Sequence, residues 1–270
     1  MKFHPSKCKV LTISLRLPIL PLFTYKLGDS PLKHDDVEKD LSVYITPRLS
    51  WNSHIDRIYS KACQKLGIVR RNGHIVSDPK CRRALYLSLV RSQFENCSII
   101  WRPTSKTLTD KLESLQKRAI KWILSEEHCN YSAELYTKKC KQVDILPLTL
   151  KFDLNDLLFL HKVINDLIPV SLPEYLTFYQ GGSRLRRSHL DSRSLVSSII
   201  PKCSQTPSYS ESETGPRNPL YNSFFYRTHM LWNTLSYDVR QTDSPSLFKS
   251  EVTKHLWKIA LGDDLDHSIS

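Results

Sequence analysis

The chain has 270 residues, and its 39 Lys and Arg against 27 Asp and Glu give a formal net charge of +12. Its seven glycines form no glycine-rich phosphate loop, and no Gly-x-Ser-x-Gly nucleophile motif occurs, so common signatures of nucleotide-binding enzymes and α/β-hydrolases are missing. Between His54 and Trp122 there are 15 Lys and Arg and 5 Asp and Glu, which is +10 of the +12. This concentration of positive charge points to a polyanion as partner.

The cysteines and apolar segments are those of a protein from a reducing, aqueous compartment. No two of the seven cysteines lie closer than eleven residues apart. That spacing fits neither a Cys-x-x-Cys metal site nor a compact disulfide framework, so we expect reduced and mostly buried thiols. The apolar stretch at residues 11–23 is interrupted by Arg16, Pro18 and Pro21 and is too short for a membrane span. We expect a cytoplasmic or nuclear protein with no membrane contact.

Two groups of side chains have some of the chemistry of a metal site. Asp35-Asp36 is an adjacent pair of carboxylates, but it lies in a polar connection with no apolar strand to hold it in place. His128-Cys129 with Cys140 has a non-standard spacing and no fourth ligand, which favours buried thiols over a zinc site. We therefore expect no catalytic residue, no metal and no cofactor.

Apolar runs near the N-terminus predict a small antiparallel sheet. The third run alternates apolar and polar residues, so Leu41, Val43 and Ile45 should share one buried face. Three strands are barely a domain, so this sheet needs helices or further protein to pack against. The strands are expected at residues 10–13, 23–27 and 41–45, with a turn at 28–31.

A basic amphipathic helix is predicted after Pro47, with Ser50 as its N-cap. Arg57, Lys61 and Lys65 lie four residues apart on the side opposite its apolar face. A solvated charged face is the ordinary explanation of such a row. Because the whole region is so strongly cationic, we favour contact with a nucleic-acid backbone. The apolar face that we expect in the core consists of Ile55, Ile58, Ala62, Leu66 and Val69.

Further helices follow the same design. Asp78-Pro79 predicts a helix that runs to about Gln93, and a third helix is predicted from Thr107. Trp101 and Trp122 lie on or beside apolar stripes, so they are assigned to the core. Backbone contact of this kind would depend on charge and shape and not on base sequence. The residues predicted to bind nucleic acid are Arg57, Lys61, Lys65, Arg70, Arg71, Lys117, Arg118 and Lys121.

The second half of the chain is predicted to be helical with one interruption. Pro147 begins a long helix that is apolar over more than half of its circumference. Residues 180–220 are rich in Ser, Pro, Arg and Gly without a sustained period, which is typical of an irregular segment. An aromatic helix is then expected at residues 221–235, and Ser244-Pro245 caps a last one.

Four blocks of this sequence, in order, resemble the part of non-LTR (LINE-type) retrotransposon reverse transcriptases that follows the catalytic palm. They are KDLSVYITPRLSWNSHIDRIYSKACQKLGIVRR, LYLSLVRSQFENCSIIWRP, LESLQKRAIKWI and SFFYRTHMLWNTLSYDVR. The matching positions are Asp40, Leu41, Val43, Leu49, Trp51, His54, Ile55, Ala62 and Leu66 in the first block, Leu89, Val90, Glu95 and Trp101 in the second, Leu112, Glu113, Gln116, Ala119 and Ile123 in the third, and Ser223, Phe224, Leu231, Trp232, Asn233 and Leu235 in the fourth.

The resemblance implies the end of the palm, then a helical thumb that grips the template-primer duplex, then a C-terminal helical region. The chain departs from the family at Ser42, where glycine is preferred, at Asn96, where tyrosine is frequent, and at Ser236, where proline occurs. The aromatic-x-Asp-Asp hairpin that holds the catalytic metals in this family would lie upstream of Met1, and the sequence has no substitute for it. We therefore expect no polymerase activity from this chain on its own.

The expected fold is mainly α: a helical thumb-like bundle with a small N-terminal antiparallel β-sheet and a C-terminal helical region. The expected partner is an RNA/DNA duplex, bound non-specifically, with a palm and fingers portion of the same element as a second partner. Two other interpretations remain open, a host protein-interaction module that reuses the scaffold and a translated relic without function. The expected segments are an end-of-palm β segment (1–50), a thumb-like basic bundle (51–130), a central helical segment (131–179), an irregular excursion (180–220) and C-terminal helices (221–270).

Overall fold

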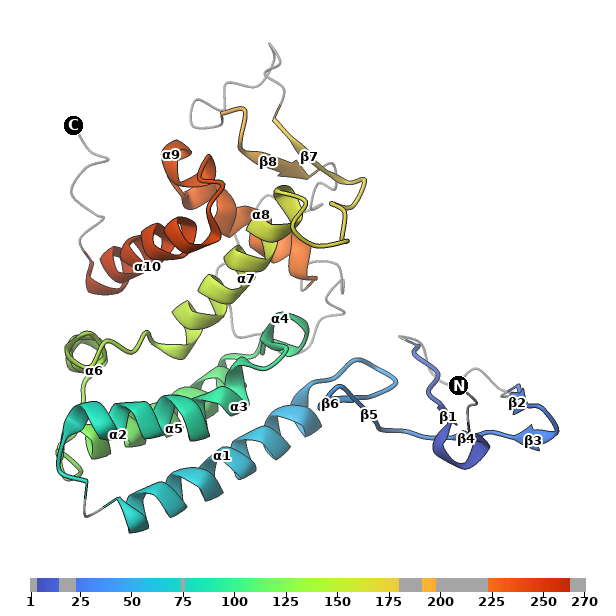
Figure 1. The fold of residues 1–270 in the computed structure, drawn as a ribbon, viewed down its shortest axis with the longest axis horizontal. Helices are drawn as coiled ribbons and strands as arrows, with labels where there is room; N and C mark the ends of the chain where they lie inside the picture. Colours follow the sequence, from blue (N-terminus) through green and yellow to red (C-terminus); the bar gives the residue numbers. More distant parts are fainter. Residues whose placement is uncertain (1–3, 15–22, 74–75, 180–190, 198–222, 263–270) are drawn as a thin grey trace. The chain divides into compact units, whose positions relative to one another are not determined.

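A computed structural model of the chain describes residues 4–14, 23–73, 76–179, 191–197 and 223–262. Over these residues the protein is mainly helical with short two-stranded β pairs, as predicted (Figure 1). The chain divides into two compact units, Met1–His128 and Cys129–Ser270. Each unit is described by itself below.

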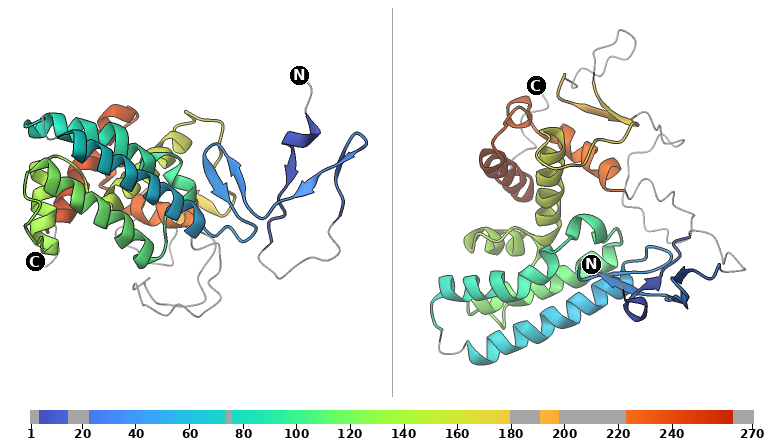
Figure 2. Two further views of the ribbon diagram at one scale, coloured as in Figure 1. Left: turned by 90° about the horizontal axis from the view of Figure 1, so that it is seen from below. Right: turned by 45° about the vertical axis from the view of Figure 1, so that its right-hand side comes forward.

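The described N-terminal strands form separate two-stranded pairs, so the prediction of one antiparallel sheet was wrong (Figure 2). Each ladder holds only two or three residues, so each pair closes on its nearest partner and leaves no long edge for a third strand. After the 3-10 turn η1 (Pro5–Lys7), β1 (Lys9–Val10) runs parallel to β4 (Lys33–His34), β2 (Lys26–Leu27) is antiparallel to β3 (Ser30–Pro31), and β5 (Glu38–Asp40) is antiparallel to β6 (Val43–Ile45).

A two-residue hairpin joins β5 to β6. Asp40 pairs with Val43, and φ is 43° at Leu41 and 72° at Ser42 between them. Two successive residues with positive φ are the mark of the type I′ turn, whose twist matches that of the flanking strands. Leu41 is therefore 82% exposed at the tip, which corrects the prediction that it shares the buried face of Val43, itself only 3% exposed.

The first unit is built around two long helices, α1 (Asn52–Asn72) and α5 (Lys106–Ile123). The helix predicted to begin at Asp78-Pro79 is confirmed, and the Oδ1 atom of Asp78 accepts the N–H of Lys80 at 3.0 Å. The connection between the long helices contains α2 (Pro79–Leu85), the π-helical turn η2 (Tyr86–Arg91), α3 (Ser92–Glu95) and the short α4 (Ser98–Trp101).

The apolar faces predicted for the two long helices are largely confirmed. The N-cap prediction was wrong, because Trp51 precedes α1 without a side-chain capping bond and Thr46 Oγ1 accepts the N–H of Ser50 at 3.0 Å. Ile58 is only half-buried. The predicted positions that are buried are Ile55, Ala62, Leu66 and Val69 on α1 and Leu112, Leu115, Ala119, Trp122 and Ile123 on α5.

The second unit is organised around α7, which packs against α8 and α10. The helices predicted after Pro147, near residue 221 and after Ser244 are confirmed to within a few residues, whereas α6 and α9 were not predicted as separate helices. A buried ion pair joins α7 to α8, with Arg227 Nε 2.9 Å from Oδ2 of Asp156. The helices are α6 (Ala133–Gln142), α7 (Leu148–Ile164), α8 (Phe224–Thr234), α9 (Tyr237–Arg240) and α10 (Pro245–Leu261).

Part of the predicted irregular excursion is ordered as a strand. β8 (Leu195–Ser197) pairs antiparallel with β7 (Leu176–Phe178), and Leu195 is buried. The excursion is corrected to this extent. Its remaining residues, 180–190 and 198–220, lie outside the described part of the chain, as do residues 221–222 of the predicted aromatic helix.

The thiols are more accessible than predicted. Of the six cysteines that the structure describes, only Cys140 is buried, because the others lie on helix flanks and in connections; Cys203 lies outside the described residues. Cys129 and His128 are exposed, and no group of three or more His, Cys, Asp and Glu in the described ranges could hold a metal ion. None of the described helices is long and apolar enough to cross a membrane.

Candidate nucleic-acid interface

The first feature of the candidate interface is the seam along which α1 and α5 pack. Lys111 Nζ lies 2.6 Å from Oδ1 of Asp56, and 5.0 Å from the ring centre of Tyr59. Further along, Arg118 Nη2 donates to the Tyr59 hydroxyl at 3.3 Å and to Cys63 Sγ at 3.2 Å. Both residue numbers increase together along the seam, so α1 and α5 run parallel. Arg118 is therefore engaged in packing the two helices.

The second feature is a row of cations on α1, here called the α1 row: Arg57, Lys61 and Lys65. At 100° per residue, Lys61 lies roughly 160° around the helix from Tyr59, so the row is on the flank away from α5. Arg57 and Lys61 are exposed, Lys65 is half-buried, and the Arg57 guanidinium lies 4.4 Å from the ring centre of Tyr44. Within the described ranges, no carboxylate forms an ion pair with the row.

The third feature is a hollow of about 660 Å³ near the C-terminal ends of α1 and α5. Arg70 Nη2 lies 2.6 Å from Oε2 of Glu127 at its rim. Arg82 donates from Nη1 to the Trp122 carbonyl at 2.9 Å and to Ser125 Oγ at 2.7 Å, which satisfies groups at the end of α5. The lining residues, here called the arginine hollow, are Gly67, Arg70, Arg71, Arg82, Trp122, Ser125, Glu127 and His128.

The arginine hollow could receive a phosphate oxygen, because three guanidinium groups and one carboxylate line it. Arg82 was not among the predicted site residues. The only sequence signal for it was its membership of the basic region, since its position depends on the loop that brings α2 to the end of α5.

The structure does not bring the eight predicted cations onto one surface. The α1 row lies on one flank of α1, Arg118 lies in the seam on the other, and Arg70 and Arg71 line the hollow. Lys117 and Lys121 are half-buried on α5. Helical periodicity places a residue off the apolar stripe, but it does not show which flank the neighbouring helix covers, and that is why the set divides.

Residues from the first two resembling blocks meet in the core of the first unit. The rings of His54 and Trp101 are 5.1 Å apart, and both side chains are buried. His54 Nδ1 accepts the N–H of Tyr44 at 3.3 Å, and Trp101 Nε1 donates to the Asn96 carbonyl at 2.7 Å. Burial lowers the pKa of His54. These block residues therefore hold β6, α1 and α4 together.

A buried polar network joins the second and third blocks. Gln116 Oε1 accepts from the Tyr86 hydroxyl at 3.0 Å and from Arg91 Nη1 at 2.9 Å. Arg91, which is 2% exposed, also donates from Nε to Oε1 of Glu95 at 3.0 Å. Gln116 Nε2 lies 3.4 Å from Oε1 of Glu113. The block positions Glu95, Glu113 and Gln116 thus surround one guanidinium that sequence patterns did not single out.

The π-helical turn explains why Tyr86 and Arg91 face the same partner. Residues five apart lie on one side of a π turn, whereas on an α-helix they would be about 140° apart. Tyr86 and Arg91 span η2 and both bind Gln116 of α5. An α-helical reading of the sequence therefore could not predict this network.

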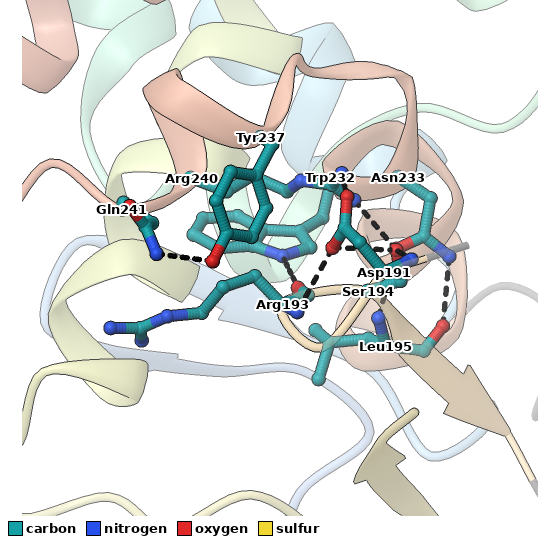
Figure 3. Close-up of polar contacts among 9 residues, drawn as sticks. All are labelled: Asp191, Arg193, Ser194, Leu195, Trp232, Asn233, Tyr237, Arg240 and Gln241. Atoms are coloured by element: carbon teal, nitrogen blue, oxygen red, sulfur yellow. Dashed lines mark hydrogen bonds and ion pairs between the residues drawn. The ribbon is translucent and has the colours of Figure 1, made fainter. Parts of the chain in front are cut away.

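In the second unit, the Trp-Asn pair of the fourth block holds the segment before β8 (Figure 3). Trp232 Nε1 donates to the Arg193 carbonyl at 2.9 Å. Asn233 Nδ2 donates to the Leu195 carbonyl at 2.8 Å, and its Oδ1 accepts the N–H of Leu195 at 2.9 Å. Trp232 is fully buried. The two side chains fasten α8 to the backbone that leads into β8.

A buried arginine completes this anchor. Arg240 donates from Nη1 to Ser194 Oγ at 2.9 Å and forms an ion pair with Asp191 (Figure 3). Asp191 Oδ1 in turn accepts the N–H of Arg193 at 2.9 Å, which closes a tight turn. Sequence patterns did not find Asp191, Ser194 or Arg240, because the turn lies in the stretch that composition marks as irregular.

Comparisons with protein-family models, with curated proteins and with solved structures find no match to this chain. Its function is therefore inferred from its own charge, contacts and motif positions.

Proposed function

We propose that this chain is the end-of-palm, thumb and post-thumb part of a LINE-type reverse transcriptase, and that it binds a template-primer duplex without polymerising by itself. It contacts phosphates, so binding is independent of sequence. The single observation that carries the proposal is the excess of +10 between His54 and Trp122, together with the exposed, unneutralised α1 row within that region.

The carboxylates of this region support the proposal because packing occupies them. Asp56 pairs with Lys111, Glu95 pairs with Arg91, and Asp78 caps α2. None of these contacts involves the α1 row, whose cations lie about 6 Å apart for each four-residue step. A polyanion therefore meets the row without first displacing an internal ion pair, and it releases counterions when it binds.

The contacts between block residues support assigning the blocks to one fold. His54 of the first block packs on Trp101 of the second, and Glu95 of the second shares Arg91 with Gln116 of the third. Positions matched from separate motifs thus form interlocked contacts within the first unit. Matching residues spread at random over a surface would give no such support.

The proposal is tested by charge reversal of the α1 row, as Arg57→Glu, Lys61→Glu and Lys65→Glu in one protein. Its control is Lys26→Glu, Lys33→Glu and Lys162→Glu, three exposed lysines with the same change in net charge. We expect the first variant to lose most of its affinity for a labelled RNA/DNA duplex in anisotropy titrations and the control to keep it. Equal losses would contradict specific use of the row, and intact binding by both would favour a protein-interaction module.

Catalysis is tested separately with a primer-template, Mg²⁺ and deoxynucleotides. We expect no extension, because the chain offers no aromatic-x-Asp-Asp hairpin to hold two metal ions. Extension by the pure protein that survives removal of trace polymerases would overturn this part of the proposal.

A further inference from the structure

A second cationic hollow lies in the other unit, along α10 beside the end of α6. Its volume is about 780 Å³. The lining residues, here called the α10 groove, are Lys141 and Asp144 near the end of α6, and Ser246, Lys249, Ser250, Thr253, Lys254, Trp257, Lys258 and Leu261 from α10. The α10 residues recur at steps of three and four, so they form one continuous face of that helix.

The groove is rich in donors of hydrogen bonds to anions. Four lysines and three hydroxyl side chains line it, against the single carboxylate of Asp144. Lys254 forms an exposed ion pair with Glu251 at 2.8 Å, a contact that is weak in water. Lys249 and Lys258 form no ion pair with any residue of the described ranges. The groove therefore keeps a positive excess that no internal contact cancels.

The shape of the groove indicates a linear ligand. From Ser246 to Leu261 the face extends along α10 for about 22 Å, and Lys249, Lys254 and Lys258 follow one another at intervals of about 6 to 8 Å. A single inorganic anion would need converging donors instead. A chain of regularly spaced phosphates matches a row of cations of this length.

The aromatic residue of the groove is not available for base stacking. Trp257 is only 5% exposed, and Lys141 Nζ lies over its ring at 4.6 Å from the centre. Single-strand binders that stack bases need an open ring face. The groove can therefore contact backbone phosphates only.

We propose that the α10 groove is a second nucleic-acid site, which binds the phosphate backbone of a strand without sequence preference through Lys141, Lys249, Lys254 and Lys258. It belongs to the Cys129–Ser270 unit, so it does not depend on the α1 row.

The test compares four full-length proteins in titrations with labelled oligo(dT): the unchanged chain, the groove variant Lys249→Glu, Lys254→Glu and Lys258→Glu, the α1-row variant, and both combined. We expect the groove variant to bind roughly 10- to 100-fold more weakly at 0.1 M salt, and its plot of log K against log salt to be less steep by about 0.9 for each lost phosphate contact. The same loss is expected when the groove variant is compared with its parent in the α1-row background.

Two arms keep the result decisive. A Lys→Gln triple at the same three positions removes the charge without adding acid, and far-UV circular dichroism checks that both variants are helical. The Lys26, Lys33 and Lys162 reversal serves again as the charge-matched control. Loss of binding equal to that of the control would overturn the groove as a site, as would binding of the groove to phosphatidylserine vesicles but not to oligo(dT). Failure of the α1-row variant alone would count against the first site and leave this one standing.

Discussion

Asn233 pairs with the backbone of Leu195 at both of that residue's hydrogen-bonding groups, donating to its carbonyl at 2.8 Å and accepting its N–H at 2.9 Å. The side chain therefore supplies α8 with the equivalent of one strand residue beside β8, whose own ladder with β7 has only three residue pairs. A residue singled out by resemblance thus proves to hold two segments that are 38 residues apart in the sequence.

Replacing Asn233 with Ala should lower the free energy of unfolding by about 1 to 3 kcal/mol, because it leaves both backbone groups of Leu195 without their partner. Urea denaturation followed by tryptophan fluorescence measures the change. Asn72→Ala is the matched control, since Asn72 is exposed and makes one bond, to the Ile68 carbonyl. A loss at Asn233 no larger than that at Asn72 would show that the pairing does not stabilise the fold.

Gln116→Leu should cost about 2 to 4 kcal/mol, since it removes the acceptor of the buried Arg91 guanidinium and of the Tyr86 hydroxyl. Adding Arg91→Met and Tyr86→Phe should recover part of the loss, because no buried donor then lacks a partner. Stability measured on the single, double and triple variants gives the coupling. Strictly additive losses would argue against the network.

Ser42→Gly should stabilise the protein by roughly 1 kcal/mol, because φ is 72° at this position and a Cβ atom is strained there. Ser42→Val should act in the opposite direction, since β-branched residues tolerate positive φ poorly. Thermal melting of both variants is the measurement. Glycine is also the residue that the reverse transcriptase resemblance prefers here, so the physical argument and the resemblance agree.

Stability should fall as the pH drops below about 6.5. Burial lowers the pKa of His161, opposed by its bond to the Thr242 carbonyl and by Asp243, and burial likewise lowers that of His229. The unfolded chain therefore binds protons first, and the stabilisation present above the unfolded pKa is lost as the pH falls towards the lower folded pKa. Chemical denaturation at a series of pH values measures this slope.

His161→Phe should make that slope shallower, whatever its effect on stability at neutral pH, because it removes one buried group that resists protonation. The ring stacks on Phe248 with 4.1 Å between centres, so an aromatic replacement keeps that contact. The exposed His128→Gln is the control and should leave the slope unchanged. An unchanged slope in His161→Phe would mean that the buried histidine does not set the acid sensitivity.

Much of the helical architecture could be predicted from the sequence, because local patterns determine it. The stripe from Ile55 to Val69 and the Asp78-Pro79 start each depend on residues within a few turns of one another, and the structure confirms them. The strands were less predictable. Whether Leu41 lies on a strand face or at a hairpin tip depends on the pairing of Asp40 with Val43, which alternation alone does not reveal.

The candidate sites depend even more on tertiary context. Period and charge identified Arg118 as an outward cation, but its position in the seam follows from where α1 lies. Arg91 faces Gln116 because of a π-helical turn, and Arg240 faces Asp191 across a segment with no regular period. Each of these residues acquires its role from a partner far away in the sequence.

The most direct test of the account is the salt dependence of duplex binding by the unchanged chain and by the Arg57, Lys61 and Lys65 reversal. We expect log K to fall linearly with log salt for the unchanged chain, and the slope of the variant to be smaller by about 2 to 3, which corresponds to roughly 0.9 for each of up to three phosphate contacts on B-form DNA. The Lys26, Lys33 and Lys162 control should keep the original slope. A flat salt response of the unchanged chain, or identical slopes for all three proteins, would contradict nucleic-acid binding through the α1 row.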